Sequence, residues 1–421
     1  MKIKATLIVL TVVLLQSCTL TRSLLYWGPD ITDHKIFPYT EVLPGDTMYQ
    51  FKKSEDKSVE NYIVRAKNWE PSDTVDLPLT DFLEQKTGTV SFLVIRNDSI
   101  LYEQYFRGYN RSAISTIFSV SKSVTSLLTG IAIDEGYIES IHDPVTKYIP
   151  ELAKKDPNFS KLTIEHLLNM RAGFKFDEDS YLPWSKAAKI YYGTNLLGKI
   201  KRMKFEHEPG EVKSYQSITT ALLGVVLERA IGRNLGEYLE EKIWVPLGME
   251  NRATWSMDDK RHRTAKAFCG LNTSAIDLAK IGRLYLNNGS WGGKQIVNSE
   301  WVTQSTTPNT QNYGYQYQWY SFGIWLTNPN SDSELFADTT SAREVMKKMS
   351  YRYPYTNMWE SERSKGEWGI TAYAKQYYAL GIIHQTLFVD PEQNIIVVRL
   401  GEHSEMDYPN FIYNLIKSIS Q

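Results

Sequence analysis

Residues 117–128 read IFSVSKSVTSLL and place Ser119 and Lys122 three positions apart at the start of a predicted amphipathic helix. Positions i and i+3 lie on one helix face, with Cβ atoms about 5–6 Å apart. A serine hydroxyl is a weak nucleophile until a base takes its proton, and a partly desolvated lysine can act as that base. The pattern is short, however. A second S-x-x-K occurs at residues 54–57 in a charged stretch, so the surrounding sequence has to decide.

The composition describes a chain with balanced charge. It has 421 residues, 47 Lys and Arg against 48 Asp and Glu, and a net charge of −1. This balance gives no basic excess for nucleic acid, and the length suffices for one large domain or two lobes. The sequence contains no His-Glu-x-x-His, no glycine-rich phosphate loop and no Gly-x-Ser-x-Gly. We therefore expect no metal, no cofactor, no nucleic-acid partner and no α/β-hydrolase elbow.

The N-terminus predicts export. Residues 1–18 begin with a short basic region, continue with an apolar run too short to span a bilayer, and end in Leu-Gln-Ser-Cys. This ending resembles the lipobox of bacterial lipoproteins; an ordinary signal peptide with an incidental cysteine is the alternative. Only Cys18 and Cys269 exist, so lipidation of Cys18 leaves one thiol and no disulfide. We expect a diacylated, palmitate-bearing Cys18 that anchors the protein on the periplasmic or cell-surface side of a bacterial membrane.

Local patterns predict how the remaining chain is organised. Residues 19–84 are polar and are expected to form an irregular tether and lead-in, followed by a domain over 85–421. We predict strands at 89–98, 99–109, 378–389 and 395–400, and helices at 163–170, 217–231, 234–243, 274–287 and 407–419. Gly136 is the expected stop of the Ser119 helix. Strands at both ends with helices between them predict an α+β fold, in which both chain ends form one antiparallel sheet and an all-helical lobe is inserted. The Ser119 helix would then begin at the lobe interface, where ligand sites are preferred.

Several segments, in the right order, resemble the serine β-lactamase and penicillin-binding-protein superfamily. The match is to the branch with class C β-lactamases, D,D-peptidases, family VIII esterases and 6-aminohexanoate-dimer (nylon-oligomer) hydrolases. The segments are residues 118–126, 130–136, 142–145, 163–170, 270–279, 387–391 and 395–400. One departure is Arg171-Ala172-Gly173, where a Thr-Ser-Gly is usual. The resemblance covers residues 85–420 and implies the β-lactamase/transpeptidase-like fold.

The resemblance also implies roles for three residues. Ser119 would be the nucleophile, and Lys122 would help to deprotonate it. Tyr215 begins a Tyr-Gln-Ser segment in the place of the family's Tyr-x-Asn element. A tyrosine near a lysine cation has its phenolate stabilised, so Tyr215 could take the serine proton and pass it to the leaving group. Packing is the alternative role for this tyrosine.

Two departures from the family pattern concern the substrate. Ser217 stands where an asparagine would help to hold the substrate amide, and we expect its hydroxyl to donate a hydrogen bond to the substrate with less reach. The family's Lys-Thr-Gly or His-x-Gly aligns with Ala379-Leu380-Gly381, so Gly381 is kept and the cation is missing. An amide beside Gly381, that of Ile382, could pair with the Ser119 amide as an oxyanion hole. Without the cation, the carboxylate of a penicillin or of a peptidoglycan terminus lacks its natural partner.

The sequence therefore predicts a membrane-anchored serine hydrolase that acts through an acyl-enzyme on a small ester, amide or peptide. The alternatives are a β-lactamase or D,D-carboxypeptidase, and a non-catalytic binding or sensor lipoprotein on the same fold. Residues 328–376 are polar, rich in aromatic side chains and outside the family pattern. We expect them to form a lid or wall that sets substrate size, or a plain surface insertion. The oligomeric state is not predicted.

Overall fold

The computed structural model describes residues 19–67, 74–178, 182–327, 335–402, 404 and 406–420. The chain divides into two compact units. The first comprises the described residues up to Tyr49 together with Arg111–Asp277, and the second comprises Gln50–Asn110 and Leu278–Gln421. Each unit is therefore built from separate stretches of the chain rather than from one continuous segment. Cys18 lies outside the described residues.

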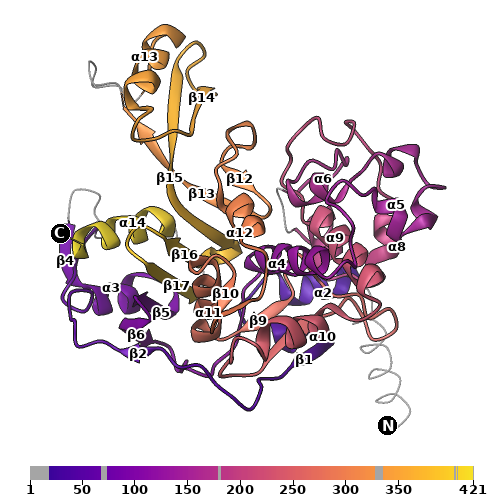
Figure 1. Cartoon of the computed structure of the whole chain (residues 1–421), viewed down its shortest axis with the longest axis horizontal. Helices are drawn as coiled ribbons and strands as arrows, with labels where there is room; N and C mark the ends of the chain where they lie inside the picture. Colours follow the sequence, from indigo (N-terminus) through magenta and orange to yellow (C-terminus); the bar gives the residue numbers. More distant parts are fainter. Residues whose placement is uncertain are drawn as a thin grey trace, which may run out of the picture. The chain divides into compact units, whose positions relative to one another are not determined.

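The second unit is built on a nine-stranded sheet that contains strands from both ends of the chain (Figure 1). Its order is β12-β13-β15-β16-β17-β5-β6-β2, and β14 also pairs with β15. All pairs are antiparallel except β2 with β6. The strands are β2 (Lys52–Lys53), β5 (Thr89–Arg96), β6 (Ser99–Tyr105), β12 (Tyr315–Gln316), β13 (Trp319–Leu326), β14 (Thr356–Glu360), β15 (Trp368–Gly381), β16 (Gln385–Asp390) and β17 (Ile395–Gly401). The predicted sheet from both chain ends, and with it the α+β fold class, is confirmed.

Helices cover the two faces of this sheet. On one face, α3 (Leu79–Lys86) and α14 (Tyr408–Ile419) pack in one apolar cluster with Phe92, Phe388 and Val397. On the other face lies α11 (Ala275–Leu286), where a Cβ added at Gly282 would come within 2.9 Å of Ile396. Ile396 and Val397 point to opposite faces because side chains alternate along a strand. Smaller elements of this unit are the hairpin β3 (Ile63–Lys67) and β4 (Thr74–Pro78), the pair β10 (Ser290–Trp291) and β11 (Lys294–Gln295), and α12 (Ser299–Thr306).

The predicted strand over 378–389 is wrong. The structure has two strands there: β15 begins earlier and ends at Gly381, and β16 starts at Gln385. The turn between them is one short 3-10 turn, and Ile383 and His384 take φ values of 51° and 64°. Left-handed backbone is unusual for a β-branched residue such as isoleucine. The two left-handed positions are Ile383 and His384, and the neighbouring Gly381 is in extended backbone, so the residue types did not indicate where the turn lies.

The first unit contains most of the helices. They are α2 (Thr19–Tyr26), α4 (Val120–Asp134), α5 (Val145–Tyr148), α6 (Ile164–Leu168), α7 (Lys186–Tyr191), α8 (Leu196–Ile200), α9 (Ser217–Ile231) and α10 (Leu235–Leu239) followed by a π turn (Glu240–Trp244). The expected stop is confirmed, since α4 ends at Asp134 and Gly136 has a φ of 77°. However, every residue from Val120 to Ala132 is buried, so α4 is buried on all sides up to its last two residues and is not an amphipathic helix.

The lobe is not all-helical, because it also holds a small antiparallel sheet in the order β1-β8-β9-β7. Its strands are β1 (Tyr39–Val42), β7 (Ser115–Thr116), β8 (Ala253–Ser256) and β9 (Leu271–Thr273). The irregular lead-in predicted for 19–84 also differs from the structure, since this segment forms α2, β1, β2, β3, β4 and α3. All of these strands are short, and two of them pair with distant parts of the chain, β1 with β8 and β2 with β6, so a local pattern did not reveal them.

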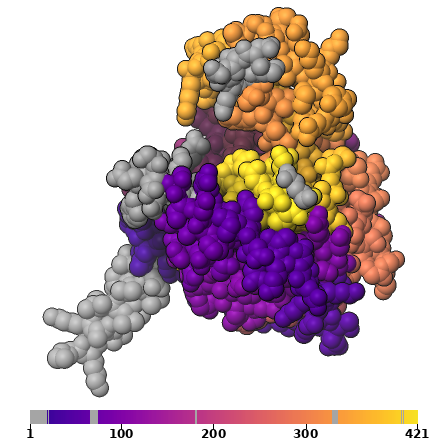
Figure 2. Space-filling model, turned by 90° about the vertical axis from the view of Figure 1, so that its left-hand side faces the viewer, coloured from indigo at the N-terminus to yellow at the C-terminus, as the bar shows by residue number. Residues whose placement is uncertain are grey.

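The described part of the 328–376 segment forms a projection where β13 ends and β15 begins, coloured orange in Figures 1 and 2. It contains α13 (Thr339–Met349) and β14, and residues 328–334 lie outside the described part. Phe336, Ala342 and Ile370 form its small core. The segment is therefore an ordered extension of the sheet with a core of its own.

Candidate active site

Ser119 lies in a tight turn just before α4. Phe118, which precedes it, has a φ of 46°, a costly conformation for a bulky residue that needs support from its surroundings. That support comes from β9: the Ile117 amide donates to the Leu271 carbonyl at 3.1 Å, and the Leu271 amide donates to Ser121 Oγ at 3.1 Å. Ser119 is half-buried, so the turn holds its hydroxyl in a fixed position that a substrate can reach.

Lys122 is buried with its side-chain nitrogen directed at Ser119. Its Nζ donates to Ser119 Oγ at 2.6 Å and to the Phe268 carbonyl at 3.0 Å, and the residue is 2% exposed. The same Nζ lies 4.9 Å from the centre of the Tyr215 ring. The structure thus brings together Ser119, Lys122 and Tyr215. The distance between Oγ and Nζ is within the range needed for proton transfer between a nucleophile and its base.

The segment that carries Tyr215 is fixed by a neighbouring loop. Gln216 Nε2 donates to two backbone carbonyls of the 174–176 segment, each at 2.9 Å. Ser217, the first residue of α9, donates to the Glu178 carboxylate from its amide at 2.8 Å and from its hydroxyl at 2.5 Å. A carboxylate is well placed there because the N-terminus of a helix carries partial positive charge. The hydroxyl hydrogen of Ser217, which we expected to serve the substrate, is directed at Glu178.

Sequence reasoning missed Glu178 and Gln216. Glu178 lies in a loop without a motif, 39 residues from the serine it contacts. No local pattern could have paired the two, since the contact depends only on how the loop folds back. Gln216 was visible as the middle residue of the Tyr-Gln-Ser element, and a polar side chain before a buried helix was its only signal.

A second buried lysine was also missed. Lys266 is fully buried, donates to the Tyr191 carbonyl and lies 4.4 Å from the centre of the Phe37 ring. Burial lowers the pKa of Lys266 to about 8, and it raises the pKa of the Asp33 carboxyl to about 6. Burial also raises the pKa of the Cys269 thiol to about 12. Since the thiolate is the reactive form, Cys269 is a poor nucleophile.

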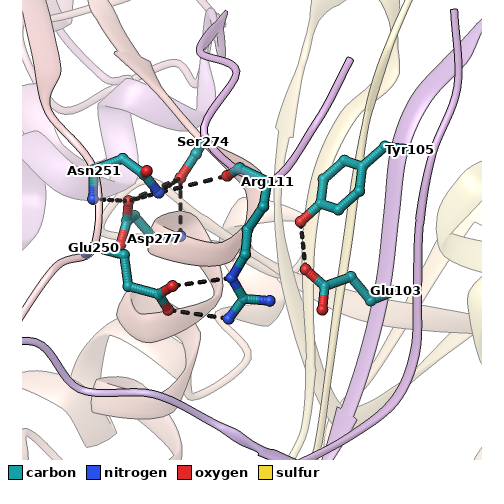
Figure 3. Close-up of polar contacts among 7 residues, drawn as sticks. All are labelled: Glu103, Tyr105, Arg111, Glu250, Asn251, Ser274 and Asp277. Carbon is teal, nitrogen blue, oxygen red and sulfur yellow. Dashed lines mark hydrogen bonds and ion pairs between the residues drawn. The ribbon is translucent and has the colours of Figure 1, made fainter. Parts of the chain in front are cut away.

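A buried carboxylate organises the segment that follows β9 (Figure 3). Asp277 accepts hydrogen bonds from the amides of Glu250 at 2.7 Å and Asn251 at 3.0 Å, and from the Ser274 hydroxyl at 2.8 Å. Arg111 in turn forms an ion pair with Glu250 at 2.9 Å. Because β9 also holds the Ser119 turn, this network stabilises the strand on which the candidate nucleophile depends.

Gly381 and Ile382 belong to the second unit, and their pairing with the Ser119 amide stays a prediction. Gly381 ends β15 in extended backbone, and Ile382 begins the turn that follows. The buried Arg399 donates to the Ile383 carbonyl at 2.8 Å, and Gln385 Nε2 donates to the carbonyl of residue 401 at 2.6 Å. The backbone around Gly381 is therefore fixed by side chains from the neighbouring strands.

One cluster in the described part of the chain has the donor types of a metal site. Asp258, Asp259 and His262 offer ligand atoms within 4.8 Å of one another. The Asp259 carboxylate, however, already accepts hydrogen bonds from the Asn195 and Arg261 amides and is 2.7 Å from His262 Nδ1. These contacts are those of a loop-capping aspartate, and they explain the cluster without an ion.

Comparison with known proteins identifies the family. A 6-aminohexanoate-dimer hydrolase from Paenarthrobacter ureafaciens is 26% identical over 308 residues, which are 66% of this chain and 77% of that protein. The solved structure of a "Putative 6-aminohexanoate-dimer hydrolase from Bacillus anthracis" has a TM-score of 0.69 at 21% identity and covers 96% of this chain and 95% of its own. A class C beta lactamase from Rhodobacter sphaeroides has a TM-score of 0.52 at 15% identity, over 80% of this chain and 95% of its own. The Beta-lactamase family profile matches residues 66–407, and the chain belongs to this family of hydrolases.

Proposed function

We propose that the chain is a serine hydrolase that works through an acyl-enzyme, with Ser119 as the nucleophile. The observation that supports this most directly is the 2.6 Å contact between Lys122 Nζ and Ser119 Oγ in a buried setting. Ser119 Oγ attacks the carbonyl carbon of the substrate while Lys122 and Tyr215 take the hydroxyl proton. The proton passes to the leaving alcohol or amine as the carbonyl–leaving-group bond breaks. A water molecule then attacks the acyl-enzyme carbonyl while Lys122 and Tyr215 take one of its protons, and this proton passes to Ser119 Oγ as the bond to the acyl group breaks and the acid is released.

We infer that the substrate is an ester or an amide without an essential carboxylate near the scissile bond. The missing cation at Ala379-Leu380-Gly381 supports this, because a penicillin or a peptidoglycan terminus would lose the partner of its carboxylate. The similarity to a 6-aminohexanoate-dimer hydrolase favours the same class of substrate. A β-lactamase or D,D-carboxypeptidase remains the second candidate because the fold is also that of a class C beta lactamase.

We further propose that the projection formed by the described residues of 328–376 sets substrate size. A groove of about 1360 Å³ runs between β13, β14 and β15, larger than the usual site for one small ligand. Trp325 and Trp359 have ring centres 5.7 Å apart, and farther along the groove the rings of Tyr320 and Tyr378 stack at 5.4 Å. Tyr378 precedes Gly381 by three residues, about 10 Å along a strand. The groove could therefore bind the distal part of an extended substrate.

We also propose that Cys18 is lipidated and anchors the exported protein to a bacterial membrane. The lipobox-like ending of residues 1–18 supports this. Among the described residues, no helix is both long and apolar enough to cross a bilayer. Intact mass of the membrane-extracted protein tests the proposal, since the anchored form begins at Cys18 and carries the mass of its acyl chains.

Covalent labelling tests the hydrolase proposal. A fluorophosphonate should add one label to the wild type and none to Ser119→Ala. The matched control is Ser54→Ala, which removes the serine of the second S-x-x-K and should leave labelling unchanged. A penicillin separates the candidate substrates: phosphonate label without penicillin label supports an esterase or amidase, and label from both supports a β-lactamase or carboxypeptidase. Label from neither would support a binding protein and refute the acyl-enzyme.

A further inference from the structure

The end of helix α2 and the residue after it expose an unusual run of large apolar side chains. Leu24, Leu25, Tyr26 and Trp27 are consecutive, and their exposed fractions are 50%, 59%, 41% and 69%. Contiguous exposed apolar surface on a folded protein usually marks an interaction site. The helix is not a loose tail, because other side chains fix it to the first unit.

The contacts of α2 hold it against α7. Ser23 is 1% exposed, Arg22 donates to the Tyr192 carbonyl at 3.5 Å, and the rings of Tyr26 and Tyr192 stack at 6.2 Å. The apolar run therefore has a fixed place on the first unit. This contradicts the tether that the sequence predicted for this segment.

A basic and aromatic hollow lies at the start of the same helix. It has a volume of about 630 Å³, and Thr19, the first residue of α2, is one of its lining residues. Trp184 also lines it and is 63% exposed, and four cations surround it: Lys186, Lys189, Lys199 and Arg202. None of the ten described residues that line the hollow is acidic. Protein surfaces that bind the headgroup region of anionic bilayers typically combine tryptophan and other apolar side chains with surrounding lysines and arginines.

We propose that α2 and the Trp184 hollow form a membrane-docking face that holds the first unit flat on an anionic lipid bilayer. This rests on the proposed acylation of Cys18. Thr19 is bonded directly to Cys18, and Leu25 lies six residues farther, about 9 Å along a helix. With no linker between the anchor and the folded body, an acylated Cys18 brings the exposed side chains of α2 to the headgroup region. The face therefore fixes the orientation of the protein on the membrane in addition to its attachment.

Single cysteines test this on the full, lipid-anchored chain. Trp27→Cys and Trp184→Cys report the docking face, and Tyr137→Cys and Val212→Cys, which replace side chains 43% and 41% exposed in the same unit, are the controls. Cys269 is buried and gives no background. The protein is inserted into preformed vesicles of phosphatidylcholine and phosphatidylglycerol and treated with a membrane-impermeant maleimide. We expect labelling at the two docking positions to be at least tenfold slower than at the controls, although the native side chains there are more exposed.

Charge-reversal variants and the intact mass of the protein distinguish a failure of the docking face from a failure of the lipid anchor. Adding Lys186→Glu and Lys189→Glu to Trp184→Cys should restore labelling to the control rate. Docking positions that label as fast as Tyr137→Cys on an acylated protein would overturn the docking face and leave the anchor standing. A protein without acyl chains would overturn the anchor and, with it, the docking face. Neither result affects fluorophosphonate labelling of Ser119, which reports the hydrolase independently and shows that each variant is folded.

Discussion

Glu178 offers a direct test of how the candidate site is held together. Its carboxylate accepts both the amide and the hydroxyl of Ser217, which is 1% exposed. A hydrogen bond to a charged group contributes about 1.5–3 kcal/mol, and a buried donor left without a partner costs about 1–3 kcal/mol. Because Glu178 itself is half-buried, water replaces part of this loss, and we expect Glu178→Ala to lower the free energy of unfolding by about 2 kcal/mol. Glu178→Gln keeps one acceptor oxygen and should cost about half as much.

The same change should affect catalysis through position. Tyr215 precedes Ser217 by two residues, so loosening the start of α9 displaces the tyrosine ring from Lys122, now 4.9 Å away. We expect kcat, and the rate of fluorophosphonate labelling, to fall at least tenfold with KM changed little. Urea unfolding and labelling kinetics measure the two effects, and Glu206→Ala, which removes an exposed carboxylate of the same unit, is the control. Unfolding within about 0.5 kcal/mol of wild type, the range of a neutral surface change, together with an unchanged labelling rate, would refute the reasoning.

Three further variants test other parts of the structure. The pKa of Lys266 falls from 10.5 in the unfolded chain to about 8 in the folded protein. Between pH 8 and pH 10.5 the lysine is therefore protonated in the unfolded state and mostly neutral in the folded state. The free energy of unfolding should therefore rise by about 3 kcal/mol from pH 8 to pH 10.5, and Lys266→Met should abolish this rise in urea titrations. Gly173 has a φ of 75°, and a Cβ there would lie 2.3 Å from the His207 carbonyl, so Gly173→Ala should destabilise by at least about 2 kcal/mol in thermal unfolding. Trp359→Ala should remove any preference for long over short acyl chains in an ester series and leave the rate on the shortest ester unchanged; an unchanged chain-length preference would contradict the groove proposal.

Much of the fold could be predicted because its central elements have strong local patterns. The helix at 217–231 was predicted with the bounds that α9 has, and β5 and β17 differ from prediction by no more than two residues at either end. These segments are rich in apolar residues, and most of their side chains are buried. Prediction failed where long-range contacts decide the conformation. The strand β1 forms only because β8 lies beside it, and the turn at Ile383 is left-handed without a glycine.

The residues of the candidate site could likewise be predicted where a local pattern marks them and not where only a contact in space does. Ser119, Lys122 and Tyr215 could be found because the first two share one helix turn and the third lies in a recognisable element. Glu178 could not be found, since its only link to the site is a contact made in space. The sequence also did not predict the exposed apolar side chains of α2. A short apolar run in a polar segment looks like part of an irregular tether until the structure shows which of its residues are exposed.

The segment from Gly270 to Ala279 shows how a family signature can have a physical basis. In the sequence it serves only as a mark of resemblance, but in the structure it holds the turn of the candidate nucleophile Ser119 in place. The strained φ of Phe118 has to be stabilised by neighbouring contacts, and the two hydrogen bonds to Leu271 supply them. Leu271 is fixed in turn because β9 pairs with β8, and Asp277 fastens the chain directly after it. Since nucleophile and base must keep their geometry to within about 0.5 Å, these supports are as necessary to the proposed reaction as the residues that carry it out.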